Sequence, residues 1–180
     1  MIKIEIPEGE FWNEKTQRFL NTPKTSLRLE HSLVSLSKWE SHWEKSFINT
    51  TKKTREETLW YIRAMTLDED VPDIVYDCLT DENIKQINNY IDSKQTATWF
   101  AENKNAKKSR EIITAEIIYY WMISLNIPFE CQHWHLERLI TLIKVCDEKN
   151  APKKKMSPSQ VAQRNRTLNE QRRAQLKTSG

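Results

Sequence analysis

Glycine is almost missing from this chain, and that scarcity limits the folds it can adopt. Of its 180 residues only Gly9 and Gly180 are glycine. Loops that cradle phosphates need several glycines, because the backbone must turn tightly and approach the ligand closely. Sheets with many tight hairpins also use glycine at their turns. The sequence therefore excludes a glycine-rich nucleotide loop and predicts an α+β fold that is predominantly helical.

The N-terminal region carries the pattern of short extended segments. Isoleucine alternates with charged residues over positions 1–7, which is the period of a strand with one buried face. Residues 25–36 alternate less regularly and predict a second extended segment that pairs with the first. Ser37 is then the expected cap of a short helix that carries three aromatic residues on one face. These residues are Trp39, Trp43 and Phe47.

The middle of the chain predicts a series of helices. The stretch from Thr54 to Glu57 has the form of a capping box and opens a helix that runs to about Met65. An acidic turn follows, and then two short helices are expected over residues 72–79 and 81–91. The second of these has a threonine as its cap and isoleucines at helical spacing.

Two longer helices are expected to form a central helical hairpin. Residues 110–125 are apolar almost all round, which is typical of a buried, central helix. The sequence from Asn126 to Pro128 ends that helix. Residues 130–149 then carry an apolar stripe with ordinary helical period, and we expect this hairpin to form the core of the fold.

Cysteine usage and hydropathy point to a soluble protein in a reducing compartment. Cys78, Cys131 and Cys146 have no paired spacing, and the N-terminus lacks the continuous apolar segment of a signal peptide. The most apolar stretch, residues 112–127, is interrupted by polar residues and is too short to cross a bilayer. We therefore expect an intracellular protein with reduced thiols and no membrane partner.

Charge is distributed unevenly between the body, residues 1–150, and the tail, residues 151–180. The tail has eight basic residues and one acid, a net charge of +7, whereas the whole chain carries only +3. Residues 151–155 read as a basic hinge, and Ser157 caps a predicted helix over residues 158–176. The apolar stripe of that helix is thin, so it is poorly suited to bury itself on its own body.

No arrangement of residues in the sequence indicates an enzyme, a metal or a cofactor. Cys131, His133 and His135 form the one cluster of metal-ligand types, but their spacing is not that of a zinc site and no second cluster accompanies them. Glu30 and His31 lack a nucleophile motif beside them and are interpreted as a polar pair in a strand. The acidic turn at residues 68–73 lacks the glycine and terminal glutamate of a calcium loop.

The basic tail has two functional interpretations, beside the plain one of a solvated and partly disordered segment. Its basic residues suit contacts with nucleic-acid phosphates, but the tail has no aromatic residue for stacking on bases, which makes nucleic acid the weaker partner. Alternatively, the helix docks on a protein surface through apolar anchors flanked by charge. The candidate partner-binding residues are Val161, Leu168, Leu176, Lys153, Lys154, Lys155, Arg164, Arg172 and Arg173.

Three stretches of the chain carry a family resemblance. They are LEHSLVSLSKWE at 29–40, REIITAEIIYYWMISLNIPF at 110–129, and KKMS at 154–157 leading into RNRTLNEQRR at 164–173. Together they resemble a set of small proteins from the structural-gene region of long-tailed bacteriophages, often regarded as tail assembly chaperones. The resemblance covers most of the chain from about Leu27.

The resemblance implies a non-enzymatic role. Tail assembly chaperones are thought to coat the long, helical tape measure protein before tube subunits polymerise around it, so the implied partner is the tape measure protein in the host cytoplasm. The resemblance carries over no catalytic residue. A structural or connector protein of the virion neck or tail is the alternative, and nucleic-acid binding through the tail is a third. Homo-oligomerisation is compatible with each of them.

Overall fold

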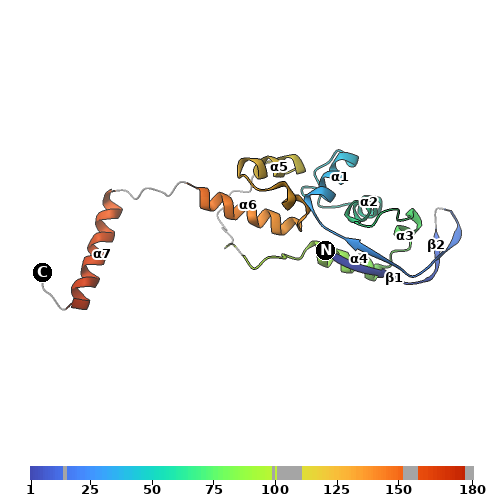
Figure 1. Ribbon diagram of the computed structural model, residues 1–180, viewed down its shortest axis with the longest axis horizontal. Coiled ribbons are helices and arrows are strands. Elements are labelled where there is room, and N and C mark those ends of the chain that lie inside the picture. The colour runs from blue at the N-terminus through green and yellow to red at the C-terminus, as the bar shows by residue number, and fades with distance from the viewer. Residues whose placement is uncertain (14–15, 99, 101–110, 152–157, 177–180) are drawn as a thin grey trace. The chain divides into compact units, whose positions relative to one another are not determined.

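The fold is a mostly helical α+β arrangement, as the sequence predicts (Figure 1). A computed structural model describes residues 1–13, 16–98, 100, 111–151 and 158–176. The chain divides into two compact units, Met1–Asp147 and Glu148–Gly180. The first unit contains the strands and most of the helices, and the second contains the C-terminal helix α7 (Pro158–Leu176).

The N-terminal strands form one antiparallel ribbon. Strand β1 (Ile2–Ile6) pairs with β4 (Thr25–Leu29), and β2 (Gly9–Asn13) pairs with β3 (Arg18–Thr22). The first pairing confirms the two predicted extended segments, whereas β2 and β3 were not predicted. The pairing register continues unchanged from one sheet into the other. Ile6 pairs with Thr25, and three positions further along each strand Gly9 pairs with Thr22. The pairing is interrupted only where Pro7 and Pro23 occur, and proline has no N–H to donate to a ladder.

Helix α1 (Leu33–Trp43) begins earlier than the sequence predicted. Ser32, not Ser37, is its cap: the Ser32 hydroxyl accepts from the Ser35 N–H, and the Ser35 hydroxyl accepts from the Ser32 N–H. This reciprocal pair satisfies two N–H groups at the helix start, so the second extended segment ends at Leu29. Phe47 lies beyond the end of the helix, although Trp39 and Trp43 lie within it.

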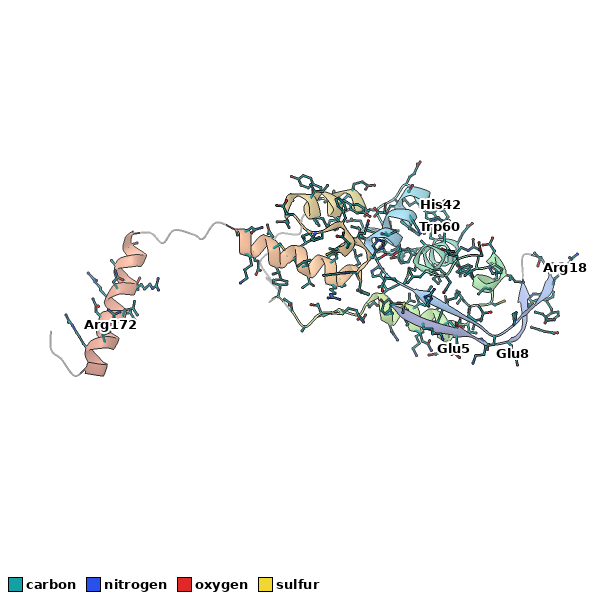
Figure 2. The ribbon with its side chains drawn as sticks, viewed as in Figure 1. Glu5, Glu8, Arg18, His42, Trp60 and Arg172 are labelled. Carbon is teal, nitrogen blue, oxygen red and sulfur yellow. The ribbon has the colours of Figure 1, made fainter. Side chains whose placement is uncertain are left out.

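The predicted caps of the next helices are confirmed. Thr54 and Glu57 form a reciprocal capping box at the start of α2 (Arg55–Met65). The short helix α3 (Asp73–Asp77) lies within the predicted 72–79 segment, and α4 (Asp81–Ile91) begins after its threonine cap. Helices α1 and α2 also meet through a ring stack of His42 on Trp60, whose centroids are 4.4 Å apart (Figure 2).

Helix α5 (Ala115–Ser124) is followed by a short 3-10 helix, η1 (Phe129–His133), and by α6 (Leu136–Asn150). The predicted start of this helix, Arg110, lies outside the described residues, and α5 begins five residues later. At its end Asn126 adopts a left-handed conformation, and the Ile127 N–H donates to the Met122 carbonyl. This arrangement satisfies carbonyls of the last turn. The predicted single helix over 130–149 is therefore divided into η1 and α6.

Buried side chains of the first unit form two hydrophobic clusters. The sheet core joins the inward faces of β1 and β4 to α2, α3 and α4. The hairpin core joins α5, η1 and α6. Helix α1 contributes to both, with Trp39 in the sheet core and Leu33 and Leu36 in the hairpin core. The predicted helical hairpin is thus one of two cores, and α1 links them.

Among the described residues, no helix combines the length and apolarity needed to cross a membrane.

Candidate functional site

Most of the predicted partner-binding residues lie on α7. Leu168 is 38% exposed, and Arg172 and Arg173 are exposed as well (Figure 2 labels Arg172). Val161, Arg164 and Leu176 also fall within the helix, but the side chains of Val161 and Leu176 lie outside the part that the structure describes. Lys153, Lys154 and Lys155 lie outside the described residues altogether.

Helix α7 presents polar and charged side chains to its surroundings on every described side. Residues 162–170 are all exposed. The helical period places Leu168 and Arg172 on one side of the helix, whereas Thr167 lies on the other side. A helix with so little apolar surface gains little from burial, and isolated helices of this length are marginal in water. Binding to a partner is a direct way to stabilise it.

A second exposed surface, which sequence reasoning missed, lies on α5. Four large side chains between residues 112 and 129 are more than half exposed, and they define what we call the α5 surface. They are Ile112 (61%), Tyr120 (66%), Ile123 (59%) and Phe129 (53%). They make up four of the ten exposed large hydrophobic side chains in the described part of the chain. Of these, Tyr120 and Ile123 lie on the same side of α5, and an exposed apolar surface of this kind typically marks an interaction site.

The expectation that this helix is buried all round is wrong. Only Ala115, Ile118 and Met122 of α5 are buried, and they pack in the hairpin core. The residues on the opposite side, including Glu116 and Tyr120, face solvent. The one charged residue inside the apolar stretch, Glu116, was the available signal, because a charged side chain is rarely buried without a partner.

The α5 surface rests on a firmly held helix start. Thr114 makes no side-chain cap, and Glu40 of α1 replaces it. The two Glu40 oxygens accept the Ala115 and Phe47 N–H groups, each at 2.7 Å. Burial raises the pKa of the Glu40 carboxyl, and the two backbone N–H donors oppose this shift. The carboxylate satisfies an N–H group at the helix start and complements the positive end of the helix dipole.

The loop after α1 adds further support beside this helix start. The Ser46 hydroxyl donates to the Ile113 carbonyl at 2.6 Å, and the Asn49 side-chain oxygen accepts the Ile113 N–H at 3.0 Å. These bonds cross more than sixty positions of the sequence, between the loop and the segment that enters α5. They hold the backbone next to Ile112, so the α5 surface is positioned by hydrogen bonds at both Ile113 and Ala115.

A buried polar cluster joins several elements of the first unit. Its members are buried or partly buried, and each forms a hydrogen bond or an ion pair with another member or with nearby backbone. They are Glu30, His31, Tyr61, Tyr90, His135 and the N-terminal amino group of Met1. The Tyr61 hydroxyl lies 2.5 Å from His31 Nδ1, and the rings of His31 and His135 meet edge to face with centroids 5.1 Å apart.

Burial controls protonation in this cluster. Burial, together with the nearby His135 and Lys53, lowers the pKa of His31 to about 3. Burial also lowers the pKa of His135, whose Nε2–H donates to the Tyr90 carbonyl. His135 Nδ1 is buried and has no hydrogen-bond partner among the described residues. Both histidines are therefore neutral at pH 7, and their polar atoms serve the packing between elements.

The other half of the cluster surrounds Glu30. Its carboxylate accepts from the Tyr90 hydroxyl at 2.5 Å and pairs with the Met1 ammonium at 2.5 Å. Burial raises the pKa of Tyr90, and the adjacent Glu30 raises it further. Glu30 and His31, predicted as a polar pair, thus bind different partners. Sequence reasoning missed this cluster, although His31 continues the alternation of buried positions set by Leu27 and Leu29.

Cys131, His133 and His135, the cluster of metal-ligand residue types in the sequence, do not converge. Cys131 and His135 are buried, whereas His133 is exposed. Among the described residues, no group of three histidine, cysteine or acidic side chains is arranged to hold a metal ion. Trp39, one of the aromatic residues of α1, is fully buried and donates its indole N–H to the Glu57 carbonyl, so its role is in packing.

Comparison with protein-family models, with curated proteins and with solved structures found no match. Two exposed surfaces of the described residues are candidate interaction sites, the basic helix α7 and the apolar α5 surface. Both have the chemistry of protein contacts.

Proposed function

We propose that this chain is a non-enzymatic tail assembly chaperone of a tailed bacteriophage, which binds the tape measure protein in the host cytoplasm. The observation that carries the proposal is α7, a helix of 19 residues whose described side chains are all exposed. The family resemblance supplies the identity of the partner, and α7 supplies a means of binding it.

The physical argument rests on what a long helical protein needs before its assembly. An amphipathic helix without its final partners exposes apolar side chains and aggregates. A second helix can cover such a stripe with a few apolar anchors and keep its own charged side chains in water. The exposed Leu168 provides such an anchor, and the sequence offers Val161 and Leu176 as further candidates. The exposed Arg172 and Arg173 keep the resulting complex soluble.

Co-expression with the tape measure protein of the same phage tests this proposal. The full chain should raise the soluble fraction of the tape measure protein, and Leu168→Asn should reduce that gain because it removes an anchor. Thr167→Asn, on the other side of the helix, is the matched control and should behave as the wild type.

Two results would contradict the proposal. One is a tape measure protein that is equally insoluble with and without the chain. The other is recovery of the chain from purified virions at a fixed copy number by mass spectrometry, which would favour the structural or connector alternative. A chaperone leaves before the particle is complete and should be absent from it.

A further inference from the structure

We propose that the α5 surface is a second docking site, which binds a basic amphipathic helix of a partner protein. The site consists of Ile112, Tyr120, Ile123 and Phe129 with the exposed carboxylates of Glu116 and Glu130. It stands on residues of the first unit alone, so it does not depend on α7 or on the identity of the partner proposed above.

The apolar part of the site has the spacing of a helix-binding face. Glu116, Tyr120 and Ile123 follow one another at intervals of four and three residues along α5, so they project from the same side of the helix. Phe129 adds an aromatic ring beyond the end of the helix, and its ring centroid lies 6.3 Å from that of Tyr119. Exposed aromatic and aliphatic side chains of this kind anchor helices that lie across them.

The backbone beneath the site is held in place before any partner binds. Glu40 holds the start of α5, and the left-handed Asn126 closes its end. The buried side chains of Ala115, Ile118 and Met122 fix the other side of the helix in the hairpin core. A preorganised surface loses little conformational entropy on binding, which favours affinity.

Charge decides which kind of partner fits. Between residues 112 and 132 the only charged residues are Glu116 and Glu130, and both are exposed. A partner helix with lysine or arginine beside its apolar stripe meets these carboxylates favourably. Phosphates of nucleic acid or of an anionic membrane would meet unfavourable charge at these two carboxylates. A second copy of the α5 surface would place glutamate against glutamate.

A designed peptide pair provides the test. The basic probe is a helical peptide of about 14 residues, or four turns, with leucine on one side and lysine on the other. The acidic probe replaces each lysine by glutamate. We expect the full-length protein to bind the basic probe, measured by fluorescence anisotropy, and to bind the acidic probe at least about tenfold more weakly. Added salt should reduce this difference, because it screens exposed charges.

Variants locate the contact. Tyr120→Ser and Ile123→Ser should each weaken binding of the basic probe by about tenfold or more, the change expected for loss of an apolar anchor. Glu116→Lys should weaken the basic probe and strengthen the acidic one. Leu67→Ser removes an exposed apolar side chain elsewhere and serves as the matched control, with unchanged affinity. Circular dichroism of each variant verifies that it is folded.

Three outcomes would overturn the proposal. The first is equal affinity for both probes, since charge complementarity would then play no part. The second is unchanged affinity for the basic probe in folded Tyr120→Ser and Ile123→Ser. The third is a dimer that forms without any peptide and is lost in those variants, which would identify a second copy of this chain as the occupant. Because α7 is intact in every variant, these results are independent of the co-expression experiment with Leu168→Asn.

Discussion

Two histidines packed ring to ring inside the protein make its stability depend on pH. His31 is almost completely buried, and the groups that face it are His135, Lys53 and the Tyr61 hydroxyl. Two of these are basic, so a proton on His31 would add a positive charge where no carboxylate contacts it directly. The fold therefore holds both imidazoles neutral, and acid acts against that state.

We predict that the free energy of unfolding falls as the pH drops below the usual histidine pKa of 6.5 and continues to fall toward pH 3. The sign follows from the pKa values: His31 titrates near 3 when folded, so the unfolded chain binds more protons throughout this interval. At about 1.4 kcal/mol for each unit of pH, His31 alone accounts for about 2 kcal/mol by pH 5. Urea unfolding at a series of pH values measures this slope.

His31→Gln should flatten the slope between pH 7 and pH 5, because a neutral amide does not titrate. His133→Gln is the control, since His133 is exposed and two residues from the buried His135. A slope that is equally steep in His31→Gln would show that other groups account for the acid sensitivity. The carboxyls whose pKa is lowered, such as Asp68 and Glu57, lose their contribution to stability at lower pH, below the usual pKa of an aspartate or glutamate.

Among the elements, α5 depends most on a side chain that is distant in sequence. Glu40 accepts two backbone N–H groups, one from the loop after α1 and one from the first turn of α5. It therefore serves as the cap that Thr114 does not provide. This contact joins residues 75 positions apart, and no local pattern in the sequence predicts it.

We predict that Glu40→Gln lowers the free energy of unfolding by about 1–3 kcal/mol, since the amide nitrogen would face an N–H donor and leave it unsatisfied. Chemical denaturation followed by circular dichroism measures the change. Glu44→Gln, an exposed position at the end of the same helix, should change stability by less than about 0.5 kcal/mol. Equal effects from the two substitutions would contradict a capping role for Glu40.

The elements that the sequence predicted are those whose signals are local. The Thr54–Glu57 box and the threonine before α4 fix helix starts through bonds that span three residues, and both were confirmed. The start of α1 was placed at Ser37 because Ser32 stood inside an apparent strand pattern. The exposure of α5 was missed because it depends on which faces the other elements cover, and hydrophobic periodicity alone does not contain that information.

The candidate functional residues likewise divide into those with local sequence signals and those that depend on contacts between distant segments. Leu168 and the arginines of α7 could be named from a cap, a thin stripe and a charge count. The α5 surface and the buried polar cluster could not, because they form only when segments distant in sequence meet. His135, for instance, contacts Tyr90 and His31 only after α4 and the β4–α1 junction have packed beside it.

At the scale of the whole first unit, α1 connects the sheet core and the hairpin core. Leu33 and Leu36 lie in one, Trp39 lies in the other, and Phe47 packs against both. Two cores that share a helix should not melt separately, because unfolding either one removes the packing of α1 in the other. The first unit should therefore unfold in one cooperative step.

We predict that Leu36→Ala, a fully buried change in the hairpin core, costs about 3 kcal/mol and lowers the unfolding midpoint of both cores together. Tryptophan fluorescence reports on both cores, because Trp39 lies in the sheet core and Trp121 and Trp134 pack against the hairpin core, whereas far-ultraviolet circular dichroism reports on all helices. The two transitions should coincide in the wild type and in the variant. Ser41→Ala, on the exposed side of α1, is the control. Fluorescence and circular dichroism transitions with different midpoints in Leu36→Ala, or a transition in two steps, would show that the cores are independent.

The two prolines that interrupt the N-terminal ribbon have a consequence for how copies of this chain meet in a crowded cell. A two-stranded ribbon has unpaired backbone groups along its outer edges, and such edges recruit strands from other molecules into aggregates. Pro7 and Pro23 remove N–H groups where β1 passes into β2 and β3 into β4, and charged Glu8 and Lys24 stand beside them. An incoming strand therefore finds no continuous ladder to extend. The same interruption that divides the ribbon into two sheets protects the protein against growth into intermolecular β-structure.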